Sequence, residues 1–147
     1  SELAADCVQD FRTRYPDRQL VPGIQPDLFV TGDQLLLQMA VNNLIENAVK
    51  YAGKEASIII DLHEQGGHIL LEVKDNGKGI PGEEKQKIFT KFYRIGNAAT
   101  KAAKGTGLGL YLTKKIVEQH NGNISVTDNV PAGAIFTIQL QSSPEKQ

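Results

Sequence analysis

Residues 33–74 read DQLLLQMAVNNLIENAVKYAGKEASIIIDLHEQGGHILLEVK, and this stretch decides the fold. Asp33 is a natural helix N-cap and Gly53 a natural stop, so we expect one long helix that runs to about Tyr51. Apolar side chains recur between these points at helical spacing, which predicts a buried stripe along one side of the helix. The stripe consists of Leu37, Val41, Leu44 and Ala48.

Strand-like segments follow this helix directly and recur near the end of the chain. Residues 56–63 and 68–74 flank Gly66-Gly67, a pair that is typical of a tight hairpin turn. Residues 123–127 and 134–140 alternate between apolar and polar side chains. They therefore predict a second pair of strands.

The other segments predict shorter elements. We expect three further helices, over residues 2–15, 82–89 and 107–120. Residues 19–30 predict two short strands, interrupted by turn signals at Pro22-Gly23 and Pro26-Asp27.

Helices interleaved with antiparallel hairpins predict an α/β (α+β) two-layer sandwich. We expect a mixed sheet of about five strands with three main helices on one face. The order is not a repeating βαβ pattern, which disfavours a doubly wound parallel sheet. At 147 residues the chain fits a single domain, residues 1–147, with a flexible tail over 142–147. Because it starts at Ser1 and not at Met, we expect it to be part of a longer protein.

Composition excludes several classes of function. The net charge of −1 provides no basic field that would favour nucleic acid. The single cysteine, Cys7, excludes an internal disulfide and a thiolate metal cluster. No apolar run approaches the roughly 20 residues of a membrane span. We therefore expect a cytoplasmic domain without direct membrane contact, and if the parent protein is anchored in the inner membrane, its anchor lies outside this chain.

Two asparagines on the predicted long helix are candidate ligands. Asn43 and Asn47 stand four residues apart and project from the same side of the helix. Their amide oxygens are hard neutral ligands, which suit a magnesium ion that also takes water and phosphate oxygens. Lys50, one turn further on, would meet a phosphate, and Tyr51 would offer its ring to a base. Taken alone, these residues are more typical of a solvated helix face.

A glycine-rich turn follows the predicted strand over residues 68–74. Residues 75–80 read DNGKGI, and Gly77 and Gly79 allow the backbone to approach a ligand closely or to adopt positive φ. The carboxylate of Asp75 could accept a hydrogen bond from an amino group such as the exocyclic amine of adenine. By itself, this pattern is also typical of a plain Asp-Asn-Gly turn.

Apolar anchors precede a loop that lacks a predicted helix or strand. Residues 88–94 read IFTKFYR, and the loop over 94–106 is rich in Gly, Ala, Asn and Lys. A loop of this length in a compact domain is usually functional, so we expect a mobile lid. Arg94 at its hinge could reach phosphates by bidentate contacts. For Phe89 and Phe92, core packing is the alternative interpretation.

A second glycine-rich segment leads from this loop into a helix. Residues 105–110 read GTGLGL, and the free N–H groups of such a junction can bind an anion. It is not a Walker-type loop, because no Gly-Lys-Ser/Thr follows, and no strand precedes it as a dinucleotide fingerprint requires. Alone it is weak evidence; together the four patterns are far more specific.

In this order the four patterns closely resemble the catalytic domain of sensor histidine kinases, over nearly the whole chain from about Leu3 to Gln141. These kinases belong to the GHKL superfamily, which also holds DNA gyrase, a heat-shock chaperone and mismatch-repair ATPases. The family's motifs are the asparagine box NLIENAVKY at 43–51, the first glycine box DNGKGI at 75–80, the phenylalanine box KIFTKFYR at 87–94 and the second glycine box GTGLGL at 105–110.

The resemblance implies a role for each side chain at the phosphate end of the nucleotide. Asn47 would coordinate the Mg²⁺ that bridges the ATP phosphates, and Asn43 would assist it. Lys50 and Arg94 would contact phosphate, and Tyr51 would flank the nucleotide. By the same resemblance, the catalytic residues would be Asn43, Lys50 and Arg94.

The resemblance also implies the residues of the base pocket and the lid. Asp75 would read adenine, and Thr137 on the last strand would line the same pocket. Lys101 and Lys104 are cationic residues of the lid without a fixed role. The remaining nucleotide-binding residues would be Gly77, Gly79 and Ile80 in the first glycine box and Gly105, Thr106, Gly107, Leu108 and Gly109 in the second.

One position favours kinase chemistry over ATP hydrolysis. The gyrase-like members carry a glutamate where this chain has Asn43, and an amide cannot act as the general base that activates water. Glu46 lies nearby in sequence but does not occupy that position. The resemblance therefore implies transfer of the γ-phosphoryl group to a side chain, with slow intrinsic hydrolysis.

The expected acceptor is a histidine outside this chain. His63, His68 and His120 are the only histidines, and none lies in the family's His-Glu acceptor pattern. The resemblance implies a separate dimerisation and histidine-phosphotransfer domain of the parent kinase as partner, and a response regulator downstream. Two alternatives remain: a nucleotide-responsive binding module that transfers no phosphate, and an anti-sigma-type serine kinase with the same fold.

Overall fold

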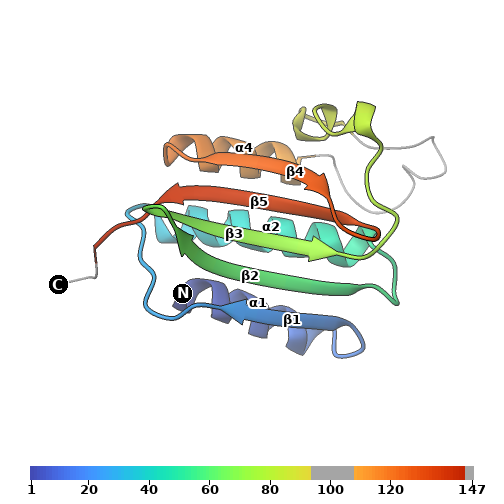
Figure 1. The fold of residues 1–147 in the computed structure, drawn as a ribbon, viewed down its shortest axis with the longest axis horizontal. Helices are drawn as coiled ribbons and strands as arrows, with labels where there is room; N and C mark the ends of the chain where they lie inside the picture. Colours follow the sequence, from blue (N-terminus) through green and yellow to red (C-terminus); the bar gives the residue numbers. More distant parts are fainter. Residues whose placement is uncertain (94–107, 145–147) are drawn as a thin grey trace.

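The protein has two layers, a five-stranded sheet and a set of helices against one of its faces (Figure 1). The structure is a computed structural model that describes residues 1–93 and 108–144. Its helices are α1 (Glu2–Arg14), α2 (Gln34–Tyr51) and α4 (Gly109–Gln119), with two short 3₁₀ helices, η1 (Gly82–Glu84) and η2 (Lys87–Phe89). Its strands are β1 (Gln19–Ile24), β2 (Ser57–Gln65), β3 (His68–Asp75), β4 (Asn123–Asp128) and β5 (Ala134–Gln141).

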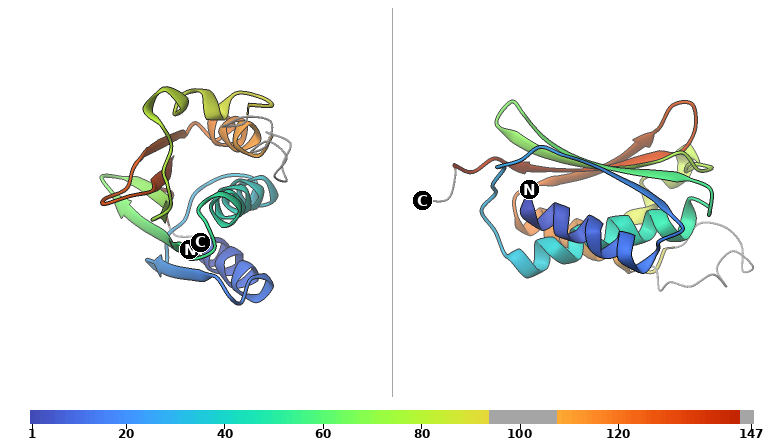
Figure 2. Two further views of the ribbon diagram at one scale, coloured as in Figure 1. Left: turned by 90° about the vertical axis from the view of Figure 1, so that its right-hand side faces the viewer. Right: turned by 90° about the horizontal axis from the view of Figure 1, so that it is seen from below.

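The sheet is mixed, with the strand order β1-β2-β3-β5-β4. Strands β1 and β2 run parallel, and the other neighbouring pairs are antiparallel. Viewed along the sheet, α1, α2 and α4 all lie on the same side of it (Figure 2). The predicted two-layer α/β sandwich with a mixed five-stranded sheet is thereby confirmed.

The hairpin between β2 and β3 forms as its sequence predicts. Gln65 pairs with His68, and both turn glycines have positive φ, 59° at Gly66 and 79° at Gly67. Positive φ at both central residues is the geometry of a type I′ turn, whose twist matches that of the paired strands. The local turn chemistry therefore sets the register of the two central strands.

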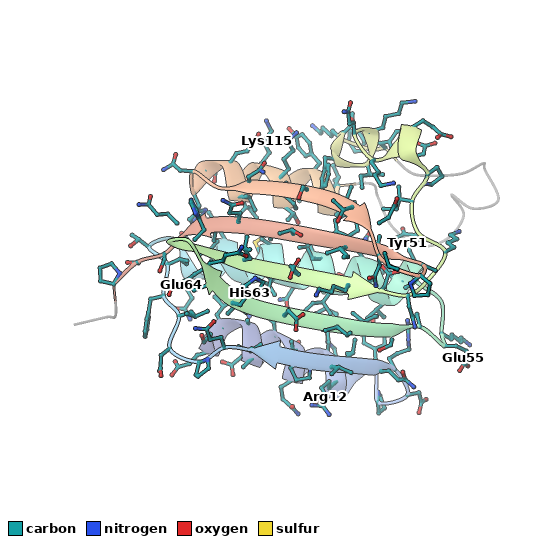
Figure 3. The ribbon with its side chains drawn as sticks, viewed as in Figure 1. Arg12, Tyr51, Glu55, His63, Glu64 and Lys115 are labelled. Atoms are coloured by element: carbon teal, nitrogen blue, oxygen red, sulfur yellow. The ribbon has the colours of Figure 1, made fainter. Side chains whose placement is uncertain are left out.

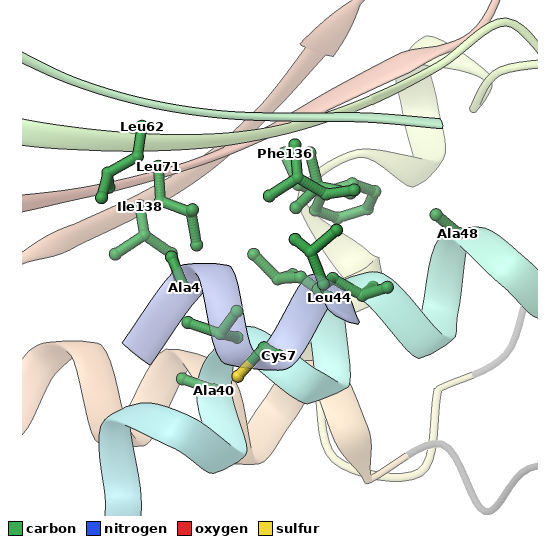
Figure 4. Packing of buried hydrophobic residues seen from close by; sticks show 14 of the residues in the cluster. Ala4, Cys7, Ala40, Leu44, Ala48, Leu62, Leu71, Phe136 and Ile138 are labelled. Atoms are coloured by element: carbon green, nitrogen blue, oxygen red, sulfur yellow. The ribbon is translucent and has the colours of Figure 1, made fainter. Parts of the chain in front are cut away.

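The core lies between the sheet and the helices. On β2 the apolar residues Ile58, Ile60 and Leu62 point inward and are buried, because alternate residues of a strand face the same side. Leu44 and Ile45 of α2 are fully buried against this face. Figure 4 shows α2 beneath the sheet, with Leu44 directed toward the strands. Among the described helices none has both the length and the apolar character needed to cross a bilayer.

Both ends of α2 are fixed by side chains. At the start, Asp33 Oδ1 accepts a hydrogen bond from the Leu36 N–H at 3.0 Å, which confirms the predicted N-cap. The N–H of Asp33 in turn donates to Nε2 of His120, at the end of α4, at 3.0 Å. At the other end, the Arg18 guanidinium donates to the carbonyls of Val49 (2.6 Å) and Gly53 (2.7 Å). These contacts fix the position of the helix that carries the asparagine box.

Two expectations about local structure are wrong. Strand β1 continues through Pro22-Gly23, because at the edge of a sheet the missing N–H of Pro22 faces no partner strand. Residues 82–89 form η1 and η2 in place of one helix. The flexible tail expected over 142–147 stays a prediction; its first residues, Ser142 and Ser143, donate backbone hydrogen bonds to Gly67 (2.9 Å) and Phe29 (2.8 Å).

Candidate functional site

A cavity of about 1200 Å³ opens at one end of the sheet. Its walls come from the second half of α2, from Asp75 at the end of β3 and residues 78–81 after it, from the start of α4 and from the β4–β5 loop. Figure 3 shows Tyr51, one of its lining residues, at the end of the sheet where β3 finishes and β5 begins. A cavity of this size has room for a ligand larger than a typical small molecule.

The α2 wall presents one polar stripe. Asn43, Glu46, Asn47 and Lys50 all line the cavity, as their spacing of three and four residues on a helix dictates. Within residues 1–93 and 108–144, the side-chain amide of Asn47 has no hydrogen-bond partner, so it is available to a ligand. Asn43 Nδ2 donates to the carbonyl of Gly109 at 3.3 Å, which leaves its Oδ1 as an acceptor.

Lys50 forms an ion pair with Glu46. Their charged atoms are 3.0 Å apart, and both side chains are partly exposed in the cavity wall. A pair of this exposure is weak, so the ammonium group can turn to a bound anion at little cost. Sequence reasoning gave Glu46 no role; its position four residues before Lys50 was the available signal.

Asp75 is a buried carboxylate in a second wall of the cavity. It is 8% exposed, and its Oδ1 accepts from the N–H groups of Gly77 (2.9 Å) and Ala134 (3.4 Å). Within the described residues, Oδ2 has no hydrogen-bond partner. One oxygen therefore anchors the side chain, and the other can accept a hydrogen bond from a ligand.

The first glycine box brings the backbone close to the end of α2. A Cβ atom at Gly77 would lie 2.5 Å from the carbonyl oxygen of Ala52, so only glycine allows this packing. Gly77 itself is behind the cavity wall, whereas Gly79 and Ile80 line it. The turn is thus part of the cavity and not a plain surface turn.

The second glycine box reaches the cavity at the start of α4. Leu108 and Gly109 line it, and the Gly109 carbonyl accepts hydrogen bonds from both Thr113 (2.8 Å) and Asn43. The first turn of α4 is thereby tied to α2.

Comparisons with known proteins identify the family. A family profile described as "Histidine kinase-, DNA gyrase B-, and HSP90-like ATPase" matches residues 32–144. Sensor protein CiaH of Streptococcus pneumoniae is 40% identical over 156 residues, which cover 99% of this chain and 35% of CiaH. Sensor histidine kinase WalK of Bacillus subtilis is 34% identical over 148 residues, which cover 99% of this chain and 23% of WalK. Among solved structures, the mycobacterial sensor histidine kinase MprB matches with a TM-score of 0.84 and 30% identity, covering 97% of this chain and 94% of that chain.

The chain belongs to the histidine kinase-, DNA gyrase B- and HSP90-like ATPase family. Within this family its relatives are sensor histidine kinases, and its fold is that of their catalytic domains, as the motifs predicted. Membership supports the use of ATP. The chain spans about a third of CiaH and about a quarter of WalK, 35% and 23% of their lengths.

Several residues expected in the site of this ATPase family lie outside the described residues. These are Arg94 and the lid over 94–106, with Lys101 and Lys104, and the first part of the second glycine box, Gly105, Thr106 and Gly107.

The expected position of Thr137 in the pocket is wrong. Its neighbours Ala134 and Phe136 point into the cavity and are buried. Because side chains alternate along β5, Thr137 faces the opposite side of the sheet, where it pairs with Glu72 and Ser125.

The two phenylalanines of the phenylalanine box differ in their burial. Phe89 packs edge-on against Phe136, with 6.2 Å between ring centroids, so core packing accounts for it. Phe92 is 62% exposed, so core packing does not account for it.

Sequence reasoning missed the β4–β5 loop. Asn129, Pro131, Ala132 and Gly133 line the cavity next to Asp75. The Pro and Gly residues between the two predicted strands indicated a turn, but nothing in the local sequence indicated that this turn reaches Asp75.

None of the three histidines lines the cavity. His63 lies on the sheet face away from the helices, 4.0 Å from Glu72 (Figure 3). His120 is bonded to Asp33 at the far end of α2. The expectation that the acceptor lies outside this chain stays a prediction.

Proposed function

We propose that this chain binds Mg-ATP and transfers the γ-phosphoryl group to a histidine on a dimerisation and phosphoacceptor domain. The observation that carries the proposal is a single cavity with an available carboxylate oxygen on Asp75 at one wall and the stripe of Asn43, Asn47 and Lys50 at another. A nucleotide has matching chemistry, an amino-bearing base joined to anionic phosphates.

The Asp75 wall supports adenine binding. The buried carboxylate holds a fixed orientation through Oδ1, so its Oδ2 can accept from the exocyclic amine of adenine. Apolar side chains of Ile80, Ile88 and Phe136 line the same cavity and can contact the faces and edge of the ring.

The α2 wall fits a magnesium ion. Asn47 offers an unpartnered amide, and Asn43 has a free amide oxygen, both suitable for Mg²⁺. No cluster of three or more His, Cys, Asp or Glu that could hold a metal exists in the described part of the chain, which is consistent with a cation bound jointly with phosphate and water. When bound, Mg²⁺ would neutralise charge on the β- and γ-phosphates. Lys50 would turn from Glu46 to phosphate.

The residues present favour transfer over hydrolysis. Asn43 cannot take a proton from water, and it stands at the position where the gyrase-like members carry the glutamate that does so. In the proposed transfer, the bond from the γ-phosphorus to the β–γ bridging oxygen breaks, a phosphorus–nitrogen bond forms and ADP leaves. A downstream response regulator and a cytoplasmic location stay predictions.

A labelling experiment tests the function. The chain is incubated with γ-³²P-ATP, Mg²⁺ and the phosphoacceptor domain of its parent protein, with Asn47→Ala and an acceptor lacking its histidine as controls. We expect acid-labile, base-stable label on the acceptor, absent from both controls. ATP binding without any transfer of label would favour the nucleotide-responsive module, and acid-stable label on serine would favour a serine kinase.

A further inference from the structure

The loop between β4 and β5 forms the cavity wall beside Asp75. Residues 129–133 connect the two strands, and Asn129 and Gly133 lie against the end of β3. None of the four motifs recognised in the sequence includes this loop, although it borders the proposed adenine pocket.

Asn129 is bonded directly to the backbone of Asp75. Its Nδ2 donates to the Asp75 carbonyl oxygen at 2.8 Å, between residues 54 apart in the chain. Gly133 packs against the same carbonyl so closely that a Cβ atom there would overlap it. The loop then continues into Ala134, whose N–H donates to the Asp75 carboxylate. Backbone and side chain of Asp75 are thus both held from one loop.

The loop is itself held in a defined shape. Asn129 N–H donates to the Gly133 carbonyl at 3.0 Å, and Asn129 Oδ1 accepts from the Val130 N–H at 2.9 Å. At the loop's start, Nζ of Lys85 forms an ion pair with Oδ1 of Asp128 at 2.8 Å. The same ammonium group donates a hydrogen bond to the Ile80 carbonyl of the first glycine box, also at 2.8 Å. The side-chain amide of Asn129 therefore connects this hydrogen-bonded loop to the end of β3.

We propose that Asn129 is a positioning residue for base recognition, which fixes Asp75 so that its carboxylate selects adenine over guanine. The inference rests on the proposed function, in which Asp75 accepts from the exocyclic amine. Guanine carries a carbonyl oxygen in place of that amine, and a carboxylate held in position repels it. If Asp75 could shift, a water molecule could bridge the two oxygens and selectivity would fall.

Asn129→Asp is the sharpest variant. It keeps the oxygen that accepts from Val130 but replaces the amide donor by a carboxylate that faces the Asp75 carbonyl. We expect ATP affinity to fall by about tenfold and the ratio of ATP to GTP affinity to fall with it, a change equal to about 1.4 kcal/mol. Affinity for inorganic tripolyphosphate, which has no base, should stay unchanged.

The measurement is isothermal titration of the 147-residue chain with ATP, GTP and tripolyphosphate in the presence of Mg²⁺. Val130→Ala is the matched control, because Val130 is 87% exposed in the same loop. Asn129→Ser removes the amide without adding charge and replaces Asn129→Asp if that variant unfolds. The double variant with Asp75→Asn should lose no more ATP affinity than Asp75→Asn alone, because Asn129 acts through Asp75.

The outcomes separate the two proposals. If Asp75→Asn lowers ATP and tripolyphosphate affinity equally, Asp75 does not read the base and the proposed adenine site fails. A second outcome is that Asp75→Asn lowers the affinity for ATP but not for tripolyphosphate, which keeps the adenine site. If Asn129→Asp then lowers the affinity for all three ligands equally, or for none, Asn129 has only a structural role and this inference alone is overturned. Additive losses in the double variant would overturn it too.

Discussion

The polar side chains of the cavity differ in how many of their hydrogen-bonding atoms already have a partner within the protein. Asp75 uses one carboxylate oxygen for two backbone N–H groups and keeps the other for a ligand. The amide nitrogen of Asn43 donates a hydrogen bond to the Gly109 carbonyl, and within the described residues neither polar side-chain atom of Asn47 has a hydrogen-bond partner. At the residue scale, Asn47 is therefore the side chain whose loss should affect a ligand most and the fold least.

Asn47→Ala should weaken Mg²⁺-dependent ATP binding by more than about tenfold. The free energy of unfolding should change by less than about 0.5 kcal/mol, since alanine favours a helix and no hydrogen bond is lost. Titration calorimetry and urea unfolding measure the two quantities. Gln38→Ala, on the exposed side of α2, is the control. Unchanged affinity for Mg-ATP would remove Asn47 from the metal site.

Cys7 gives the stability a pH dependence. Burial, aided by the nearby Asp6 and Asp10, raises the pKa of its thiol from 9.0 to about 11. Between these values the unfolded chain loses the thiol proton while the native chain keeps it, so stability falls as pH rises. The free energy of unfolding should fall by about 1.4 kcal/mol per pH unit over this window, relative to Cys7→Ala. Denaturant unfolding of both proteins from pH 8 to 11 measures this slope. The same dependence of the free energy of unfolding on pH in both proteins would contradict the prediction.

At the scale of elements, α2 and the β4–β5 loop reach the site by different means. Helix α2 is fixed at both ends by Asp33 and Arg18, and its spacing alone places Asn43 and Asn47 on one side. The loop is fixed by its contact with Asp75, which requires a glycine at 133. The φ of Gly133 is +105°, and the Asp75 carbonyl occupies the space of a Cβ atom.

Gly133→Ala should therefore destabilise the protein by at least about 3 kcal/mol, because backbone strain and overlap with Asp75 add together. Gly66→Ala is the matched comparison: its φ is also positive, at 59°, but no atom lies within 4 Å of an added Cβ. We expect that change to cost only about 1–2 kcal/mol. Thermal and urea unfolding give both values. Equal losses of unfolding free energy in Gly133→Ala and Gly66→Ala would show that the contact between residue 133 and Asp75 does not affect stability.

On the scale of the whole molecule, the cavity combines the ends of several elements at one edge of the sheet. The ends of β3 and β4, the start of β5, the start of α4 and the end of α2 all meet there. None of the histidines, and within the described residues no carboxylate other than Glu46, Asp75 and Asp128, lines it. Asp75 lies in the wall proposed to bind adenine and Asp128 is paired with Lys85, so Glu46, which loses its partner when Lys50 turns to phosphate, is the carboxylate to test as a base.

The isolated chain should hydrolyse ATP slowly, below about 10⁻² s⁻¹, the range of nucleotide sites with incomplete catalytic machinery. Glu46→Gln should leave this rate unchanged, because Glu46 does not occupy the position of the glutamate that activates water in the gyrase-like members. A coupled assay of ADP release measures both. Rapid turnover that Glu46→Gln abolishes would identify Glu46 as a base and defeat the kinase assignment.

Most of the fold could be predicted because it follows from local patterns. The stripe of α2, its Asp33 cap and the Gly66-Gly67 turn depend on residues close together in the chain. The break expected at Pro22-Gly23 was wrong because an edge strand tolerates proline, and whether a strand lies at an edge is set by the whole sheet.

The sequence by itself determined the family, the two-layer fold and the side of α2 that carries Asn43, Asn47 and Lys50, because helical and strand periodicity and motif order are properties of the chain. Only the tertiary structure decided which wall each motif meets. It places Asn129 on Asp75, 54 residues away, and directs Thr137 away from the cavity. The physical reason is that strand pairing brings distant segments together, and the packing of the core chooses the face of β5 that points inward.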